Sequence, residues 1–217
     1  MTQQLLFATP VWQIDLPPTL EPELIAREVL RLRQQDPTGL QITNQGGWHS
    51  QTNLLDHAPL APLFQWMAAS CQQALGELGW DFSLARPRFN NAWAMVNGSG
   101  NSVRAHLHPN SLMSGVVYLQ TPEHSGNIAF LDPRNGAQVL LPPLKDPQAS
   151  LLNGRHEIVP RPGLMLLFPA WLWHEVGASN SQQERISISF NIGMQPVNPA
   201  TQGAVGQATK NTLHSET

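Results

Sequence analysis

The chain has 217 residues and a net charge of −3, which suits one domain and gives no reason to expect a nucleic-acid partner. Charged residues make up only 12% of the chain, while it contains 19 prolines and 16 glycines, so a turn-rich β protein is favoured over a helical bundle. The single cysteine, Cys71, excludes an intramolecular disulfide.

The first eighteen residues have no basic region and no long apolar core, so the sequence predicts no signal peptide. No stretch approaches the length of a membrane span. We therefore expect a soluble protein of a reducing compartment, most simply the cytoplasm, with no membrane partner.

The first third of the chain is predicted to be mainly helical. Residues 5–16 are typical of an extended segment interrupted by Pro10, and residues 21–35 of a helix. Residues 44–50, NQGGWHS, are interpreted as a Gly-rich loop. Apolar residues repeat at helical spacing over about 59–79, which predicts a second helix packed on the core.

After Asp81 the pattern changes to short β-like runs separated by Gly, Pro, Asn and Ser. No helix-length segment lies between these runs, which argues against a doubly wound parallel sheet and favours a jelly roll. The eight predicted strands are 91–97, 103–108, 114–120, 127–131, 155–160, 164–168, 173–177 and 185–193.

These elements predict an α+β, mainly β fold: a double-stranded β-helix (jelly roll) with N-terminal helices packed on one sheet. We expect one domain over residues 1–197, with a helical part at about 1–85 and a β-core at about 88–195. Residues 198–217 are polar with almost no large apolar side chain, and are predicted to be a flexible tail.

Three of the eight histidines stand out by their placement. His106 and His108 are two residues apart in a strand-like run, so both side chains should project to the same face. His174 begins another short strand, which could lie beside the first in a closed β architecture. Neutral imidazole binds iron, copper, nickel and zinc, so the three form a candidate metal site. The others are interpreted as surface or satisfied core groups: His49, His57, His124, His156 and His214.

The last predicted strand has one polar face and one apolar face, in the order Arg185, Ile186, Ser187, Ile188, Ser189, Phe190, Asn191 and Ile192. If the polar face points into a barrel, Arg185 is buried and requires an anionic partner. A guanidinium binds a carboxylate through two parallel hydrogen bonds, and Ser187 could add another. An edge strand with Arg185 in solvent is the alternative.

Taken together, the motifs resemble the 2-oxoglutarate and iron(II) dependent oxygenases, and more narrowly an uncharacterised bacterial and phage group of that superfamily. The resemblance covers roughly residues 44–193, and it rests on the shared order of NQGGWHS, HLHPNSLMSGVVYL, FLDPR, GLMLLFPAWLWHEV and RISISFN.

This resemblance implies a jelly roll that holds Fe(II) through two histidines and a carboxylate, with 2-oxoglutarate as co-substrate. By position, His106 is the first metal ligand and His174 the distal one. Arg185 and Ser187 match the pair that binds the distal carboxylate of 2-oxoglutarate, and Tyr118 matches a tyrosine that assists them. No catalytic residue is expected beyond the metal ligands.

His108 departs from the family pattern, because most members carry Asp or Glu at its position. Three imidazoles leave the site one negative charge short of the common 2-His-1-carboxylate triad. Two alternatives stay open: Asp132 supplies the carboxylate, or His108 is the first ligand and Asn110 takes the acid position. We favour the three ligands His106, His108 and His174.

Three functions follow from these patterns. The first is an Fe(II) and 2-oxoglutarate-dependent hydroxylase acting on an unknown small-molecule or peptide substrate. The second is a cupin-like three-histidine metalloenzyme that does not use 2-oxoglutarate, although Arg185 and Ser187 argue against it. The third is a binding module that keeps the metal site without the chemistry. The sequence leaves a homodimer open.

Overall fold

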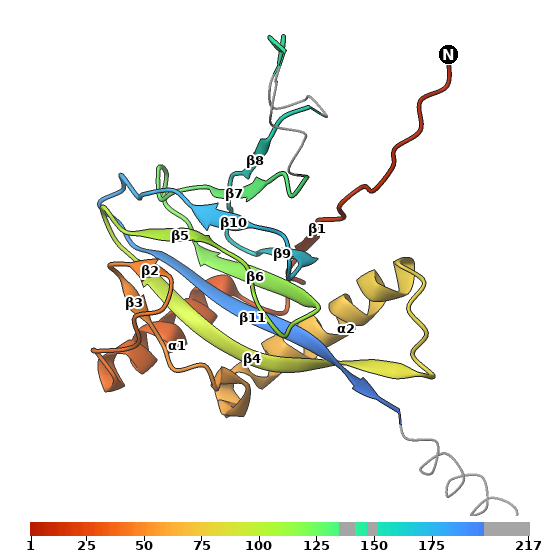
Figure 1. The fold of residues 1–217 in the computed structure, drawn as a ribbon. Coiled ribbons are helices and arrows are strands. Elements are labelled where there is room, and N and C mark those ends of the chain that lie inside the picture. Colours follow the sequence, from red (N-terminus) through yellow and green to blue (C-terminus); the bar gives the residue numbers. More distant parts are fainter. Residues whose placement is uncertain (135–141, 147–151, 198–217) are drawn as a thin grey trace, which may run out of the picture.

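The computed structural model describes residues 1–134, 142–146 and 152–197. Two antiparallel sheets face each other, and two helices cover the outer face of the larger sheet (Figure 1). This is the predicted jelly roll with helices packed on one sheet. The predicted tail, 198–217, lies outside the described residues. No helix in the described part of the chain is long and apolar enough to cross a membrane.

The larger sheet has the strand order β1-β9-β6-β11-β4-β3. Every neighbouring pair in it is antiparallel. Its strands are β1 (Trp12–Asp15), β9 (Leu164–Pro169), β6 (Met113–Gln120), β11 (Arg185–Pro196), β4 (Ala85–Asn97) and β3 (Trp48–His49).

The smaller sheet has the order β2-β5-β10-β7-β8 and is also antiparallel throughout. Its strands are β2 (Asn44–Gln45), β5 (Ser102–His106), β10 (His174–Val176), β7 (Ile128–Leu131) and β8 (Arg155–Ile158). All eight strands predicted after Asp81 are therefore present, with ends shifted by up to six residues.

The helices form because their apolar residues face the larger sheet. α1 (Pro22–Gln35) has Pro at its first turn, where the missing N–H costs nothing. Two 3-10 turns, η1 (Leu54–Asp56) and η2 (Ala58–Leu60), lead into α2 (Ala61–Glu77). The predicted second helix was thus two residues too long at each end. Buried side chains of both helices share one core with the outer face of the larger sheet.

The N-terminal third also contains strands that the sequence did not predict. Only Trp12–Asp15 of the predicted extended segment is a strand. The predicted loop over 44–50 holds two short strands that belong to different sheets, because β2 pairs with β5 whereas β3 pairs with β4. Gly46 and Gly47 lie between them with φ of 70° and 71°, a backbone region that favours glycine. This glycine pair carries the chain from one sheet to the other.

Candidate metal centre

Strand pairing brings two of the predicted ligands face to face. His106 ends β5 and His174 begins β10, and the two residues are direct cross-strand partners in the smaller sheet. Directly opposed residues of an antiparallel pair project to the same face. The ring centroids of these two histidines are 4.3 Å apart.

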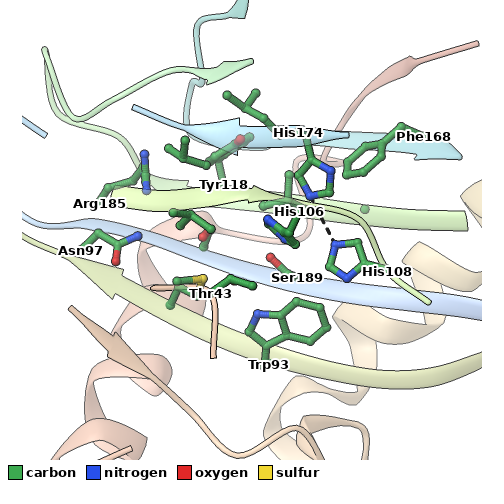
Figure 2. A pocket seen from close by; sticks show the side chains of 17 residues that line it. Thr43, Trp93, Asn97, His106, His108, Tyr118, Phe168, His174, Arg185 and Ser189 are labelled. Atoms are coloured by element: carbon green, nitrogen blue, oxygen red, sulfur yellow. Dashed lines mark hydrogen bonds between the residues drawn. The ribbon is translucent and has the colours of Figure 1, made fainter. Parts of the chain in front are cut away.

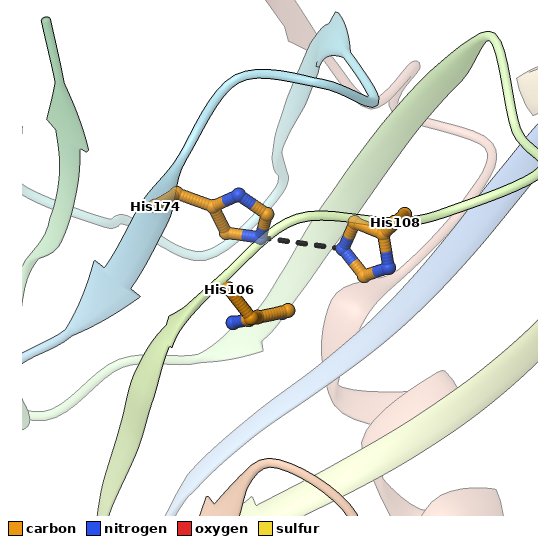
Figure 3. A group of neighbouring side chains, drawn as sticks. All are labelled: His106, His108 and His174. Atoms are coloured by element: carbon orange, nitrogen blue, oxygen red, sulfur yellow. Dashed lines mark hydrogen bonds between the residues drawn. The ribbon is translucent and has the colours of Figure 1, made fainter. Parts of the chain in front are cut away.

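His108 joins them from just beyond the end of β5. Its backbone N–H donates to the carbonyl of Ala170 at 2.9 Å, which ties this segment to the turn after β9. The imidazole Nε2 of His108 lies 3.3 Å from Nε2 of His174 (Figure 3). One nitrogen from each of His106, His108 and His174 lies within 4.8 Å of the other two.

Backbone carbonyls fix how two of the rings are oriented. Nδ1 of His106 lies 2.7 Å from the carbonyl of Arg104, and Nδ1 of His174 lies 2.9 Å from that of Leu172. A carbonyl only accepts hydrogen bonds, so each Nδ1 carries the proton and each Nε2 keeps a lone pair. Such outer hydrogen bonds orient metal-binding histidines.

Burial keeps the three imidazoles neutral. Burial, with a smaller contribution from the neighbouring His106, lowers the pKa of His174 to about 3 and that of His108 to about 4. Burial also lowers the pKa of His106. Neutral imidazole is the form that binds a metal ion. Two nitrogens about 2.1 Å from one metal are separated by roughly 3.0–3.4 Å. The observed 3.3 Å between His108 and His174 therefore fits a shared cation.

The two alternative ligands do not take part in this cluster. Among the described residues, the group with metal-binding geometry contains the three histidines alone. The Asp132 carboxylate accepts from the guanidinium of Arg134 at 2.7 and 2.9 Å and lines a different pocket. Asn110 lies in the turn after His108 with a φ of 62°, and its carbonyl accepts from Asn90. The arrangement favours three imidazoles.

A pocket between the two sheets extends from the histidines to Arg185 (Figure 2). It contains the predicted metal ligands and all three predicted co-substrate residues. The lining residues include Trp93, Met95, Asn97, His106, His108, Val116, Tyr118, Ile128, Phe168, His174, Arg185, Ser187 and Ser189. Apolar side chains make up much of this wall, which restricts the access of water.

Arg185 is buried at the end of the pocket away from the histidines, with 3% of its surface exposed. Its Nη1 donates to the carbonyls of Ser125 and Gly126, both at 2.9 Å. Among the described residues, no carboxylate forms an ion pair with Arg185, and no acceptor bonds to its other nitrogens. Burial lowers the pKa of the guanidinium, although Tyr118 opposes this. A buried guanidinium with free donors is a binding site for an anion.

Tyr118 and Ser187 lie beside the guanidinium, because they are partners across β6 and β11. Both are buried and both line the pocket. Burial raises the pKa of the Tyr118 phenol to about 12, so it stays protonated and can donate a hydrogen bond. The structure thus brings Arg185, Ser187 and Tyr118 together at one end of the cavity and the histidines at the other.

One histidine outside the metal cluster packs against the site. His49, interpreted as a surface or core histidine, is buried and stacks on Trp93, with ring centroids 5.6 Å apart and planes within 5°. Trp93 in turn lies 5.7 Å from His108. Trp171 and Trp173, which flank His174 in sequence, are half exposed and do not line the pocket. The sequence signal for His49 is its place in NQGGWHS, where Trp48 and His49 directly follow two glycines.

The jelly roll, the three-histidine cluster and the buried arginine in one cavity are the features that the sequence resemblance implied. Residues 91–191 match the model of the family described as "Putative 2OG-Fe(II) oxygenase", and this segment includes every predicted site residue. The family resemblance predicted from the sequence is thereby confirmed. No curated protein matches the chain.

Solved structures share the fold at low sequence identity. A Pseudomonas putida prolyl-4-hydroxylase is 19% identical over 85% of this chain and 92% of its own, with a TM-score of 0.55. HygX from Streptomyces hygroscopicus, with nickel, 2-oxoglutarate and hygromycin B bound, is 14% identical over 85% and 83%, with a TM-score of 0.55. A Trichoplax adhaerens prolyl hydroxylase in complex with a hypoxia inducible factor peptide is 13% identical over 84% and 83%, with a TM-score of 0.59.

Proposed function

We propose that this protein is an Fe(II) and 2-oxoglutarate dependent hydroxylase whose iron is held by His106, His108 and His174. One observation carries the proposal: a single cavity has three neutral imidazoles at one end and, at the other, a buried guanidinium that has no ion-pair partner among the described residues. A keto acid with a remote carboxylate satisfies both ends at once. A metal site alone would not require the buried arginine, and an anion site alone would not require the three histidines.

The histidines hold the metal in a fixed orientation. The carbonyls of Arg104 and Leu172 keep the protons on Nδ1 of His106 and His174, so both Nε2 lone pairs face the centre. With three protein ligands, coordination positions remain for a co-substrate. When bound, iron and 2-oxoglutarate would let this class use O₂ to couple decarboxylation of the keto acid, which gives succinate and CO₂, to hydroxylation of a substrate C–H bond.

Arg185 binds and orients the co-substrate. Arg185 and Ser189, which lies beside the histidines, are four positions apart along β11, so their backbone positions at the two ends of the pocket are about 13 Å apart. That separation leaves room for a five-carbon dicarboxylate and its contacts at each end. Ser187 and the protonated Tyr118 add donors beside the guanidinium, and the apolar wall limits competing water.

The substrate is proposed to be a small molecule or a peptide. HygX is described with hygromycin B and the Trichoplax enzyme with a peptide, so the fold accommodates both kinds of ligand. We also propose the cytoplasm as the compartment. A reducing compartment suits Fe(II), and the lone Cys71 is buried and unpaired.

The test is an anaerobic titration of the Fe(II)-loaded protein with 2-oxoglutarate, followed by visible absorption. We expect an absorption band that saturates, and tighter binding of 2-oxoglutarate than of pyruvate, which has no remote carboxylate. A charge-assisted bidentate contact in a shielded pocket is worth about 2–4 kcal/mol, or roughly 30- to 1,000-fold in affinity. Arg185→Ala should lose most of that preference and keep its metal.

Arg27→Ala is the matched control, because Arg27 is an exposed arginine of α1 and lies outside the pocket. Arg185→Lys should fall between the wild type and Arg185→Ala, since an ammonium cannot reproduce the planar fork. Equal affinity of the wild type for 2-oxoglutarate and pyruvate would overturn the proposal in favour of a three-histidine enzyme that does not use 2-oxoglutarate.

A further inference from the structure

Strands β4 and β11 continue past the rest of the larger sheet as a two-stranded ribbon (Figure 1). β6 pairs with β11 only as far as Met113 opposite Ile192. β4 and β11 remain paired as far as Ala85 opposite Pro196. One face of this ribbon therefore continues the pocket-facing side of the sheet without a covering strand.

The side chains on that face follow from the register. Alternate residues of β11 point the same way, so Gly193 and Gln195 share the face of Ser189. Their cross-strand partners are Arg88 and Arg86, and directly opposed residues share a face. Both arginines are therefore on the pocket-facing side, beyond the end of the pocket.

This face begins at the loop that carries His108. Asn90 is the extra residue of a β-bulge, and its side chain crosses over Gly193, where an added Cβ would lie 2.6 Å from it. The Asn90 amide donates at 3.1 Å to the carbonyl of Asn110 and at 3.1 Å to the hydroxyl of Ser111. The ribbon is thus fastened to the loop directly after a metal ligand.

The exposed groups on this face are hydrogen-bond donors. Arg86 and Arg88 are exposed, and within the described part of the chain neither guanidinium forms a hydrogen bond or an ion pair. Asn91 uses its Oδ1 to accept from Asn191 at 2.9 Å, and its Nδ2 bonds to none of the described residues. We name Arg86, Arg88, Asn90 and Asn91 the ribbon strip. The free donors of Arg86, Arg88 and Asn91 and the positive charge of the two arginines complement a ligand rich in carboxylates.

We propose that the ribbon strip binds an acidic polypeptide in an extended conformation and leads it to the metal centre. The inference rests on the proposed hydroxylase function, which it extends to a substrate class. Arg86 and Arg88 project from one face about 6.6 Å apart, which is also the spacing of alternate side chains in an extended peptide. Trp93, beside the histidines, lies about 15 Å along the strand from Arg88. That distance suits a chain rather than a small metabolite.

Single-stranded nucleic acid is the other anionic polymer with repeated charges. The net charge of −3 and the absence of an exposed aromatic side chain from the ribbon strip do not favour it. It therefore enters as an outcome of the test rather than as the proposal.

The probe is a fluorescein-labelled Glu-Ala repeat of about ten residues, long enough to span about 30 Å when extended. Binding is measured by fluorescence anisotropy on the full chain, both without metal and with Ni(II) and 2-oxoglutarate. We expect the Glu-Ala peptide to bind more tightly than a Lys-Ala peptide, and its binding to weaken as the ionic strength rises. The R86Q/R88Q double variant should bind roughly 3- to 20-fold more weakly.

R27Q is the matched control, because it removes an exposed arginine from α1, and it should bind like the wild type. Equal binding by the double variant, no preference for the acidic peptide, tighter binding of oligo-dT, or equally effective competition by free glutamate would each overturn the proposal. The metal-free measurement separates these failures from failure of the hydroxylase proposal, which depends on the 2-oxoglutarate titration. The arginine pair is outside the pocket, so the double variant should give an unchanged 2-oxoglutarate titration.

Discussion

Strand β11 separates two regions of the molecule: the core shared with the helices on one face, and the pocket between the sheets on the other. Its outward face carries Ile186, Ile188 and Phe190 into a core shared with both helices, where each of the three is completely buried. Its inward face carries Arg185 and Ser187 into the pocket. Adjacent residues of this strand thus point to opposite faces. One set stabilises the core, and the other set forms the binding pocket.

The comparison shows how this fold accommodates polar groups without losing its core. The helix-covered side is mainly apolar, and its few polar groups are paired: Trp48 Nε1 donates to the carbonyl of Asp36 at 2.7 Å. The pocket side keeps free donors and lone pairs that are costly to bury, and they are retained because ligands can satisfy them. Substitutions on the two faces should therefore change different quantities, and the predictions below test that division.

The largest expected effect is the loss of metal from the pocket side. His174→Ala removes one of three ligands, so the content of divalent metal should fall from about one ion per protomer to a small fraction. The helix-covered core is untouched, so far-UV circular dichroism should be unchanged. Metal content is measured by elemental analysis after dialysis.

His156→Ala is the control for this variant, because His156 is an exposed histidine of β8 outside the three-histidine cluster. It should keep full metal content. Retention of full metal content by His174→Ala would refute the ligand assignment. Loss of metal by both variants would point to a non-specific effect of removing histidines.

On the opposite face the effect should be on stability. The Phe190 ring packs edge-on against Phe89 at 5.6 Å and lies over Gly115, where an added Cβ would be 2.3 Å from the ring. Phe190→Ala leaves a cavity there and should cost about 3–5 kcal/mol. For a chain of this size that lowers Tm by roughly 6–20 °C.

Ser189→Ala is the matched variant, because it changes the adjacent residue on the pocket face. It should lower the free energy of unfolding by less than about 1 kcal/mol. Similar decreases in Tm for Phe190→Ala and Ser189→Ala would show that the helix-covered face of β11 does not contribute more to stability than the pocket face.

Much of the fold was predictable because long strands display their periodicity. β11 alternates polar and apolar residues over eight positions, and the sequence alone indicated which face packs on helices and which lines the pocket. Arg185 and the histidines were predictable for a related reason. Their positions on predicted strands, together with the order of the surrounding motifs, singled them out from the other histidines and arginines.

The missed features depend on contacts between distant segments. β2 and β3 have two residues each, too few to show any alternation. His49 is identified as a buried neighbour of the site only through its stacking on Trp93, and no local pattern encodes that contact. Asn97 ends β4, as predicted, but no sequence pattern indicated that its buried Oδ1 bonds to none of the described residues.

A smaller effect is expected where α1 is attached to the turn before α2. The Glu28 carboxylate accepts from Arg31 at 2.6 Å and also contacts His57, and the Arg31 hydrogen bond in particular lowers the pKa of Glu28 from 4.5 to about 2. A carboxyl group with a lowered pKa stabilises the fold above its unfolded pKa, and that contribution is lost as the pH falls through the folded pKa.

Glu28→Gln should therefore destabilise the protein by about 1 kcal/mol at neutral pH, and the deficit should shrink between about pH 4.5 and pH 2. Chemical denaturation across that range measures it. Glu23→Gln, on the exposed side of the same helix, is the control and should change little. A deficit that is independent of pH would mean that packing, rather than charge, fixes α1.

The smallest effect is expected for His108→Asp, although it changes a proposed metal ligand. The substitution restores the common arrangement of two histidines and one carboxylate, and a negative charge beside the cation offsets the loss of an imidazole. Metal content should therefore stay near one ion per protomer, and the affinity for 2-oxoglutarate should not fall, because Arg185 holds the remote carboxylate. His108→Glu is a useful second variant, since its longer side chain reaches further from the loop toward the centre. His108→Ala sets the lower limit, because it removes the ligand without replacement. If His108→Ala retains iron as well as the wild type does, His108 does not bind the metal and the site rests on His106 and His174 alone.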